Sequence, residues 1–418
     1  MPADALTPTF AESIPGPAWL SAQRLAAAQR YERGEAPTAE REEWRYSRID
    51  DVDVSKYALH DTPTEVAVSS VDLGPFAGRA LLRNGQVVAV AIDDALAAKG
   101  VVVASARTLT EPLGFDLPEP VGGPDSFDDL NAGFAPDPLV IIVPRGVVVD
   151  APIHIEHHVD AADALIVPRT IVSVGENASL RLVEWVGSEA VDALVVDRTV
   201  LHLDNAARVT RVSVNNLATS VTHLAGVCTS VGQQAELTMD HVALGGAYAR
   251  NRFDCRLVGR GASGRISALY LGAGDQMHDL RTFQSHEARD TMSDLVFKGA
   301  VDDRAHAVYT GLIQVGEEAA GTNANQSNRV ITLSEHAWAE SVPNLEIHHN
   351  DVKCSHATAV GPIDVEQRFY LESRGVPPEA AERLVVNGFF AEVLGSIADE
   401  RVVDLVAPLI ADKLAGSR

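Results

Sequence analysis

The chain has 418 residues, of which 46% are hydrophobic and 22% are charged, a composition typical of folded globular proteins. Its 34 lysines and arginines against 58 aspartates and glutamates give a formal net charge of −24, which repels phosphate backbones and argues against nucleic acid as a partner. Three cysteines in so long a chain argue against a disulfide framework, and the longest apolar runs, such as residues 139–143, are too short to cross a bilayer.

The first part of the chain, residues 1–75, is predicted to be a helical N-terminal domain. Its opening residues have neither the basic start nor the apolar core of a secretory signal, so we expect a cytoplasmic protein with no membrane segment. Pro17 is followed by a helix-compatible stretch with Gly34 just beyond its end. A second short helix is expected over residues 38–47.

The sequence becomes rich in β-forming residues after a mixed α/β connecting segment, residues 76–137. Within that segment Asn84-Gly85 separates two apolar runs, which predicts a β-hairpin. Over residues 138–361, short β-rich runs follow one another, and no amphipathic helix interrupts them for about two hundred residues. A doubly wound α/β fold is therefore excluded, because it needs a helix after nearly every strand.

A weak internal repeat in this region favours a parallel β-helix. Segments such as Val-Gly-Glu-Asn-Ala recur with their alanines 29, 28 and 27 residues apart, at Ala178, Ala207, Ala235 and Ala262. A unit of short strands and one polar turn suits one coil of a β-helix, and a small alanine lets successive corners stack closely. An antiparallel β-sandwich with evenly spaced turns stays open as the alternative.

The last part of the chain, residues 362–418, is predicted to be a C-terminal helical domain. One helix is expected over residues 364–374, with Gly375 just beyond its end, and Pro377-Pro378 begins a second stretch with apolar residues at helical spacing. We expect this domain to pack on the end of the β-helix, and capping of the last coil is one use for it.

The sequence carries none of the common motifs for nucleotide binding or hydrolysis. It has no GxxxxGK[ST] loop, no GxGxxG after a strand, no GxSxG elbow and no HExxH motif. We therefore expect a protein that is not an enzyme and binds no nucleotide itself, so that any ATP chemistry belongs to a partner.

Cys354 and His356 are the candidate metal ligands. They lie two residues apart, so on a strand their side chains emerge from the same face, about 7 Å apart. Thiolate and imidazole both bind iron and zinc, but two ligands cannot close such a site, so His348, His349, solvent or another chain would supply the rest. A packed Cys354 beside a structural His356 stays open as the alternative.

The other cysteines and histidines are weaker candidates. Cys228 and Cys255 lie in apolar strand runs, so we expect them in the core. The adjacent His157-His158 pair looks like a metal-binding pair, but neighbouring residues of a strand point to opposite faces, which makes such a pair a poor chelate.

Several irregular motifs closely resemble the SufB/SufD family, and the SufD branch in particular. They are residues 41–46 (REEWRY), 127–132 (FDDLNA), 322–326 (TNANQ), 344–347 (NLEI), 351–356 (DVKCSH), 361–364 (GPID) and 369–375 (FYLESRG). The resemblance thus spans nearly the whole chain. One departure is the glycine that commonly follows the histidine in the family, which is Ala357 here.

The resemblance implies a mainly β fold, with a right-handed parallel β-helix between helical N- and C-terminal domains. It implies a scaffold subunit of the SUF iron–sulfur cluster assembly complex that pairs with a SufB-like paralogue through the β-helix and docks a SufC-like ATPase through the C-terminal helices. A cysteine desulfurase would act on the complex indirectly. A transient iron–sulfur cluster or iron would be shared with the partner subunit, near His356 and beside Cys354.

Two alternatives to this reading remain. The first is a SufB-like or homodimeric scaffold. The sequence leaves open whether the isolated chain forms a homodimer. The second is a β-helical carbohydrate-active enzyme, against which the aromatic content of only 5% argues, because sugar binding relies on aromatic stacking.

Overall fold

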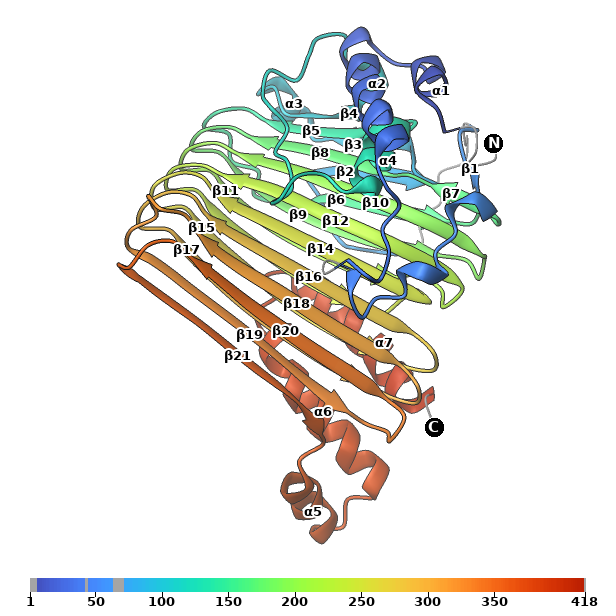
Figure 1. The fold of residues 1–418 in the computed structure, drawn as a ribbon, viewed down its shortest axis with the longest axis vertical. Helices are drawn as coiled ribbons and strands as arrows, with labels where there is room; N and C mark the ends of the chain where they lie inside the picture. Colours follow the sequence, from blue (N-terminus) through green and yellow to red (C-terminus); the bar gives the residue numbers. More distant parts are fainter. Residues whose placement is uncertain (1–5, 42–43, 63–70, 417–418) are drawn as a thin grey trace.

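Parallel strands wind the chain into a β-solenoid in the computed structural model, which describes residues 6–41, 44–62 and 71–416 (Figure 1). Successive strands alternate between two sheets, called A and B here, and each strand pairs in parallel with the strand one coil earlier. Only the two short pairings near the start of the solenoid are antiparallel within this part of the chain. The predicted parallel β-helix is confirmed, and the antiparallel sandwich is wrong.

The elements have the following bounds. Sheet A contains β4 (Val102–Ser105), β5 (Leu139–Val143), β8 (Arg169–Val174), β10 (Ala193–Leu203), β12 (Val221–Val231), β14 (Tyr248–Leu257), β16 (Met277–His286), β18 (His306–Val315) and β20 (Trp338–Ile347), with β1 (Ala58–Leu59) and β7 (Ala164–Ile166) beside them. Sheet B contains β2 (Gly78–Arg83), β3 (Gln86–Ile92), β6 (Ile153–Val159), β9 (Ser179–Ser188), β11 (Arg208–Asn216), β13 (Glu236–Ala243), β15 (Ser263–Gly272), β17 (Met292–Val301), β19 (Thr322–Thr332) and β21 (Val352–Pro362). The α-helices are α1 (Pro8–Ser13), α2 (Ala18–Arg33), α3 (Asp94–Ala98), α4 (Ser126–Phe134), α5 (Val365–Ser373), α6 (Pro378–Leu394) and α7 (Glu400–Gly416), and short 3-10 helices cover Ile49–Asp51, Val54–Lys56 and Ala106–Thr108.

The repeat seen in the sequence is the corner of each coil. The residue before each repeated alanine has a positive φ, 55° at Asn177, Ala206 and Gln234 and 70° at Gly261. The alanines themselves are buried, at 0–1% exposure. Backbone N–H groups of these corner residues donate to carbonyls of the next coil, as Asn177 does to Asn205 at 3.0 Å. Small buried alanines thus let the corners stack, as the sequence predicted.

Two local predictions near the N-terminus are confirmed and one is wrong. Asn84 and Gly85 have φ values of 48° and 80° and join the antiparallel strands β2 and β3, as a tight hairpin requires. Helix α2 ends at Arg33 with Gly34 as its C-cap. The helix expected over residues 38–47 is absent from its described part, which forms turns on both sides of residues 42–43. Tyr46 has a φ of 64°, which a right-handed helix does not allow, and Trp44 is buried against Phe127.

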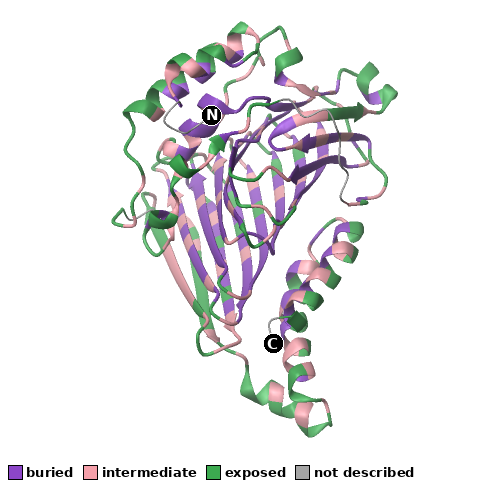
Figure 2. Ribbon diagram, turned by 90° about the vertical axis from the view of Figure 1, so that its right-hand side faces the viewer, coloured by how far each residue is buried: buried purple, intermediate pink, exposed green. Residues whose placement is uncertain are grey.

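Helices cover the outer faces of both sheets. Helices α1, α2 and α4 pack on sheet A, where Phe134 of α4 belongs to one cluster with Leu194 of β10. Helices α6 and α7 pack on sheet B, where Phe390 joins Val212 of β11 in another cluster (Figure 2). No helix within the described ranges has the length and apolarity needed to cross a membrane.

The expectation that the C-terminal domain packs on the end of the β-helix is wrong. Helices α6 and α7 lie along the side of the solenoid, while α5 projects beyond its last strands (Figure 1). The physical reason is that sheet B presents an apolar outer face, with Val212, Val242 and Leu269 buried beneath the helices. Burying that face stabilises the fold more than covering one strand edge would. The last coil therefore stays open.

Candidate functional site

The open end of the solenoid exposes side chains that every earlier coil buries. Among the residues that the structure describes, strands β20 and β21 pair on one side only, with β18 and β19 respectively. Ile313 of β18 is fully buried, but Leu345, its register partner on β20, is 38% exposed. Val330 of β19 is 3% exposed, whereas its partner Val360 on β21 is 42% exposed. The inner face of this last coil is thus an uncovered apolar rim, and the strands at this end of the solenoid are coloured mostly intermediate and exposed in Figure 2.

Cys354 and His356 both face the lumen at this open end. On the preceding strand β19, buried residues alternate with more exposed ones, and the buried set includes Ala324 and Gln326. Parallel pairing places Cys354 beside Ala324 and His356 beside Gln326, so both side chains continue the lumen-facing columns. The structure therefore brings the two predicted residues onto one face of one strand.

The environments of the two side chains differ. The half-buried Cys354 packs against a cluster that includes Ile313, Val315 and Ala319, and burial raises the pKa of its thiol above the usual value. His356 is exposed. An exposed imidazole is available to a partner as it stands, whereas a packed thiol must lose a proton in an apolar setting before it can bind a metal. His356 is the more accessible ligand of the two.

Gln326 is a further polar residue at this end that the sequence reasoning missed. It is 2% exposed, and neither its amide nitrogen nor its amide oxygen has a hydrogen-bond partner within the part of the chain that the structure describes. Its side chain reaches the opposite sheet at Gly311, where a Cβ would lie 2.3 Å from the amide nitrogen. Buried and more exposed residues alternate along β19, and this two-residue period was the signal that placed Gln326 on the lumen face, beneath His356.

The other histidines do not join Cys354 and His356. Strand β20 ends at Ile347 and β21 begins at Val352, so the turn between them separates His348 from the face of β21. His348 Nε2 lies 2.9 Å from Glu346 Oε1, and His349 Nδ1 accepts a hydrogen bond from the backbone of Asp351. Across the described ranges, no three His, Cys, Asp or Glu side chains gather so that they could hold a metal ion.

The remaining cysteines and the histidine pair lie in the core. Cys228 and Cys255 are buried as predicted, and burial raises the pKa of both thiols. His157 and His158 on β6 are also buried. Burial lowers the pKa of His157 to about 4, and its Nε2 accepts a hydrogen bond from the backbone of Gly85. That bond uses a ring nitrogen that a metal would need.

A second exposed apolar surface lies on the C-terminal helices. Val365, Phe369 and Tyr370 of α5 are 71%, 69% and 57% exposed, and Leu384 of α6 is 53% exposed. Helix α5 has no buried residue. We call these four side chains the α5–α6 patch. Exposed apolar patches of this kind are typical of protein interaction sites.

The chain matches a family model and individual relatives that belong to the same family. The family model described as the SufBD core domain of SUF-system FeS cluster assembly matches residues 157–389. A SufBD-family iron–sulfur cluster assembly protein of Mycobacterium tuberculosis is 36% identical over 220 residues, which cover 51% of this chain and 55% of the relative. The chain thus spans about half the length of that relative.

Two relatives carry the SufD name. The iron–sulfur cluster assembly protein SufD of Escherichia coli is 35% identical over 173 residues, covering 41% of each chain. The SufD protein of Bacillus subtilis is 26% identical over 431 residues, covering 97% of this chain and 96% of the relative. The second match extends the likeness from the solenoid to the helices at both ends.

Proposed function

Because the chain belongs to the SufBD family of the SUF iron–sulfur cluster assembly system, we propose that it is a SufD-like, non-catalytic scaffold subunit of a cluster assembly complex. In this proposal a SufB-like paralogue pairs with its β-solenoid and a SufC-like ATPase docks on its C-terminal helices. The nascent iron–sulfur cluster is the cargo of the complex and forms at the junction of the two solenoids.

The open last coil is the observation that carries this proposal. It combines two unpaired strand edges, β20 and β21, with a lumen face that exposes Leu345, Ile347 and Val360. An uncovered edge of this kind can add the strands of another chain, because its backbone N–H and C=O groups are free to pair. A second solenoid docked there would cover the apolar rim.

His356 and Cys354 lie on that same coil, so a partner docked there would approach both. Imidazole and thiolate are ligands of iron and of iron–sulfur clusters. In our proposal His356 supplies one ligand to the cargo, the partner chain supplies others, and Cys354 is either a second ligand or part of the apolar packing. Incomplete ligation by each chain also suits a scaffold that must release its cluster.

The α5–α6 patch supports the proposed site for the ATPase. It lies on α5, which projects beyond the last strands, and on an exposed residue of α6, and none of its four side chains is among the buried ones that hold α6 and α7 on sheet B. The patch is therefore available to a partner without any rearrangement of the fold.

A complementation experiment with a matched control tests the proposal. A strain lacking the gene would carry the wild-type chain, His356→Ala or His336→Ala, since His336 is an exposed histidine in the loop before β20. We expect all three chains to co-purify with the paralogue and the ATPase, and only His356→Ala to lose growth under iron limitation. Cys354→Ala should do as much harm if its thiol is a ligand and less if it is packed.

Anaerobic analysis of iron and sulfide in the purified complexes completes the test. Wild-type complex should carry both after reconstitution, and the His356→Ala complex should carry less. Purification of the chain without either partner, or full cluster loading and normal growth of His356→Ala, would refute the proposal.

A further inference from the structure

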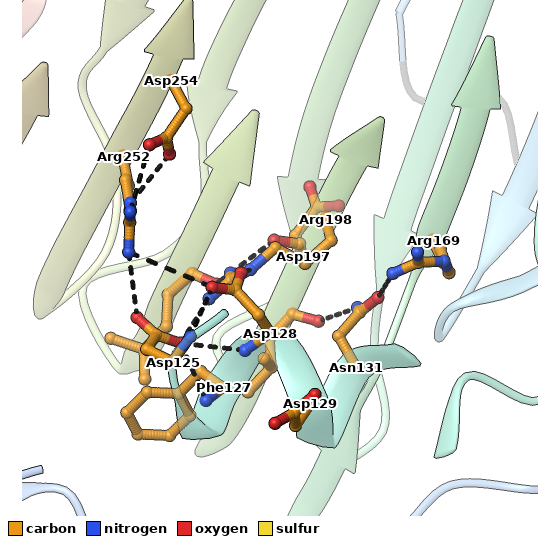
Figure 3. Close-up of polar contacts among 12 residues, drawn as sticks. Asp125, Phe127, Asp128, Asp129, Asn131, Arg169, Asp197, Arg198, Arg252 and Asp254 are labelled. Carbon is orange, nitrogen blue, oxygen red and sulfur yellow. Dashed lines mark hydrogen bonds and ion pairs between the residues drawn. The ribbon is translucent and has the colours of Figure 1, made fainter. Parts of the chain in front are cut away.

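A column of arginines crosses the outer face of sheet A beneath helix α4. Register pairs Arg169 of β8 with Arg198 of β10, and the column continues through Gly226 of β12, Arg252 of β14 and Arg281 of β16. Gly226 leaves room for its neighbour, since a Cβ there would lie 2.9 Å from the Arg198 side chain. Figure 3 shows Arg169, Arg198 and Arg252 and the carboxylates that α4 and β14 bring to them. Arg198 is buried and Arg169 and Arg252 are partly buried, so these neighbouring cations repel one another and need negative partners.

Carboxylates pair with three of the four arginines, and one of these three is Arg281, whose Nε lies 2.7 Å from Asp279. Arg198 binds Asp128 of α4, and Arg252 Nε lies 2.7 Å from Asp254. Arg252 also lies 3.6 Å from Asp125, the N-cap of α4. The helix terminus and the neighbouring strand thus balance the charge of the guanidinium groups of Arg198 and Arg252.

Arg169 instead meets a neutral amide. Its Nη1 donates to Asn131 Oδ1 at 3.0 Å, and no other hydrogen bond or ion pair of Arg169 occurs among the residues that the structure describes (Figure 3). The Asn131 amide is held in this orientation because its Nδ2 donates to the carbonyls of Pro168 and Val196, at 2.7 and 2.8 Å. Burial lowers the pKa of Arg169 to about 10. The guanidinium is thus partly removed from water and forms no ion pair among the described residues, although the charge of the Asp128 carboxylate offsets part of the effect of burial.

Arg169 lines a cavity of about 290 Å³ between sheet A, α2, α4 and the segment at residues 115–124. The volume is close to the lower end of the range for small-molecule sites, about 300–1,000 Å³. Apolar side chains form much of the wall, including Leu20 of α2, Phe115, Leu117 and Val200 of β10. The segment at residues 115–124 is fixed over the sheet, because the Val121 N–H donates to Asp254 at 2.9 Å.

The acidic side chains of the cavity are either paired or at its exposed edge. Asp128 and Asp254 are held by arginines, and Asp129 lies 2.7 Å from Arg30. Asp116 and Glu119 on the covering segment are exposed. They repel multiply charged anions such as phosphate more than they repel a single negative charge. The cavity thus combines one unpaired cation, apolar walls and an acidic edge.

We propose that this cavity binds a small organic monocarboxylate, with the carboxylate on the guanidinium of Arg169 and a short apolar body against the walls. A guanidinium matches a carboxylate through two parallel hydrogen bonds, and such charge-assisted bonds are the strongest that side chains make. The site is separate from the open last coil, so it would act as a binding site independent of the proposed scaffold function.

Calorimetric titration of the full chain tests this proposal. The probes are butyrate and benzoate, their neutral amides butyramide and benzamide, and inorganic phosphate. We expect the carboxylates to bind and the amides and phosphate not to. Arg169→Gln should weaken carboxylate binding by about tenfold or more, because it removes a charged hydrogen-bond donor. Arg208→Gln, at an exposed arginine of β11, is the matched control and should change nothing.

Protection of a buried thiol gives a second measurement that does not depend on how Arg169→Gln folds. Cys228 lines the cavity and is 7% exposed, whereas Cys255 is fully buried. In a Cys354→Ser background, benzoate at ten times its dissociation constant should slow modification of Cys228 by a methanethiosulfonate reagent about tenfold. Binding of the amides as tight as that of the carboxylates, preferential binding of phosphate, no carboxylate binding, or unchanged reactivity of Cys228 would each overturn the proposal.

Discussion

The exposure of the apolar rim on the last coil gives the contribution that its side chains make to the affinity for the proposed paralogue. Leu345, Ile347 and Val360 are 38%, 42% and 42% exposed. Full burial of such a side chain contributes about 1.5–3 kcal/mol, so covering the remaining two-fifths contributes about 0.6–1.2 kcal/mol each. The three together contribute about 2–3.5 kcal/mol, or about 30- to 400-fold in the dissociation constant. Replacing all three by serine should weaken association by this factor.

The assay is sedimentation of the purified chain with the SufB-like paralogue of its host, together with circular dichroism to verify the fold. Met292→Ser is the matched control, because Met292 is 53% exposed on β17, away from the open coil. We expect the control to bind as the wild type does. The reasoning fails if the triple variant keeps its affinity within about threefold, or if Met292→Ser weakens binding equally.

Three further predictions concern the helices and the lumen. Phe390→Ala on α6 should destabilise the fold by about 3–5 kcal/mol in urea unfolding, because the ring is fully buried on sheet B. Phe369→Ala on α5 should leave stability unchanged and weaken ATPase binding in pull-downs. Equal stability of the two variants would contradict the assigned packing. Gly299→Ala should lower the free energy of unfolding by about 1–3 kcal/mol in the same assay, since its Cβ would lie 2.0 Å from a tyrosine ring. Gly361→Ala is the control and should leave stability unchanged, because a Cβ there would have no atom within 4 Å. Burial lowers the pKa of Lys413 on α7 from 10.5 to about 7. Between these two pH values the unfolded chain binds more protons than the folded chain, so stability rises with pH across this range. Lys413→Met should remove the rise when unfolding is measured at both ends of the range, and a rise that persists would assign it to other groups.

The sequence predicted the class of fold because its evidence is local and periodic. Alanines spaced 29, 28 and 27 residues apart mark equivalent corners, and each needs only its own coil and the next to bury its side chain. The Asn84-Gly85 hairpin likewise depends on φ preferences of two adjacent residues. The shared face of Cys354 and His356 follows from the two-residue period of a strand, so the sequence was sufficient for that as well.

Only the tertiary structure decided where the helical ends pack. The same amphipathic pattern is compatible with a cap on the last coil or a layer on the side, and the apolar outer face of sheet B selects the side. The open coil, the burial of Gln326 beneath His356 and the cavity at Arg169 all follow from packing between residues distant in sequence. Local sequence determined the strands, their faces and the corners, because these depend on neighbours along the chain. The exposed edge and the unpaired guanidinium depend on which surfaces remain uncovered after every element has packed, and no local pattern contains that information.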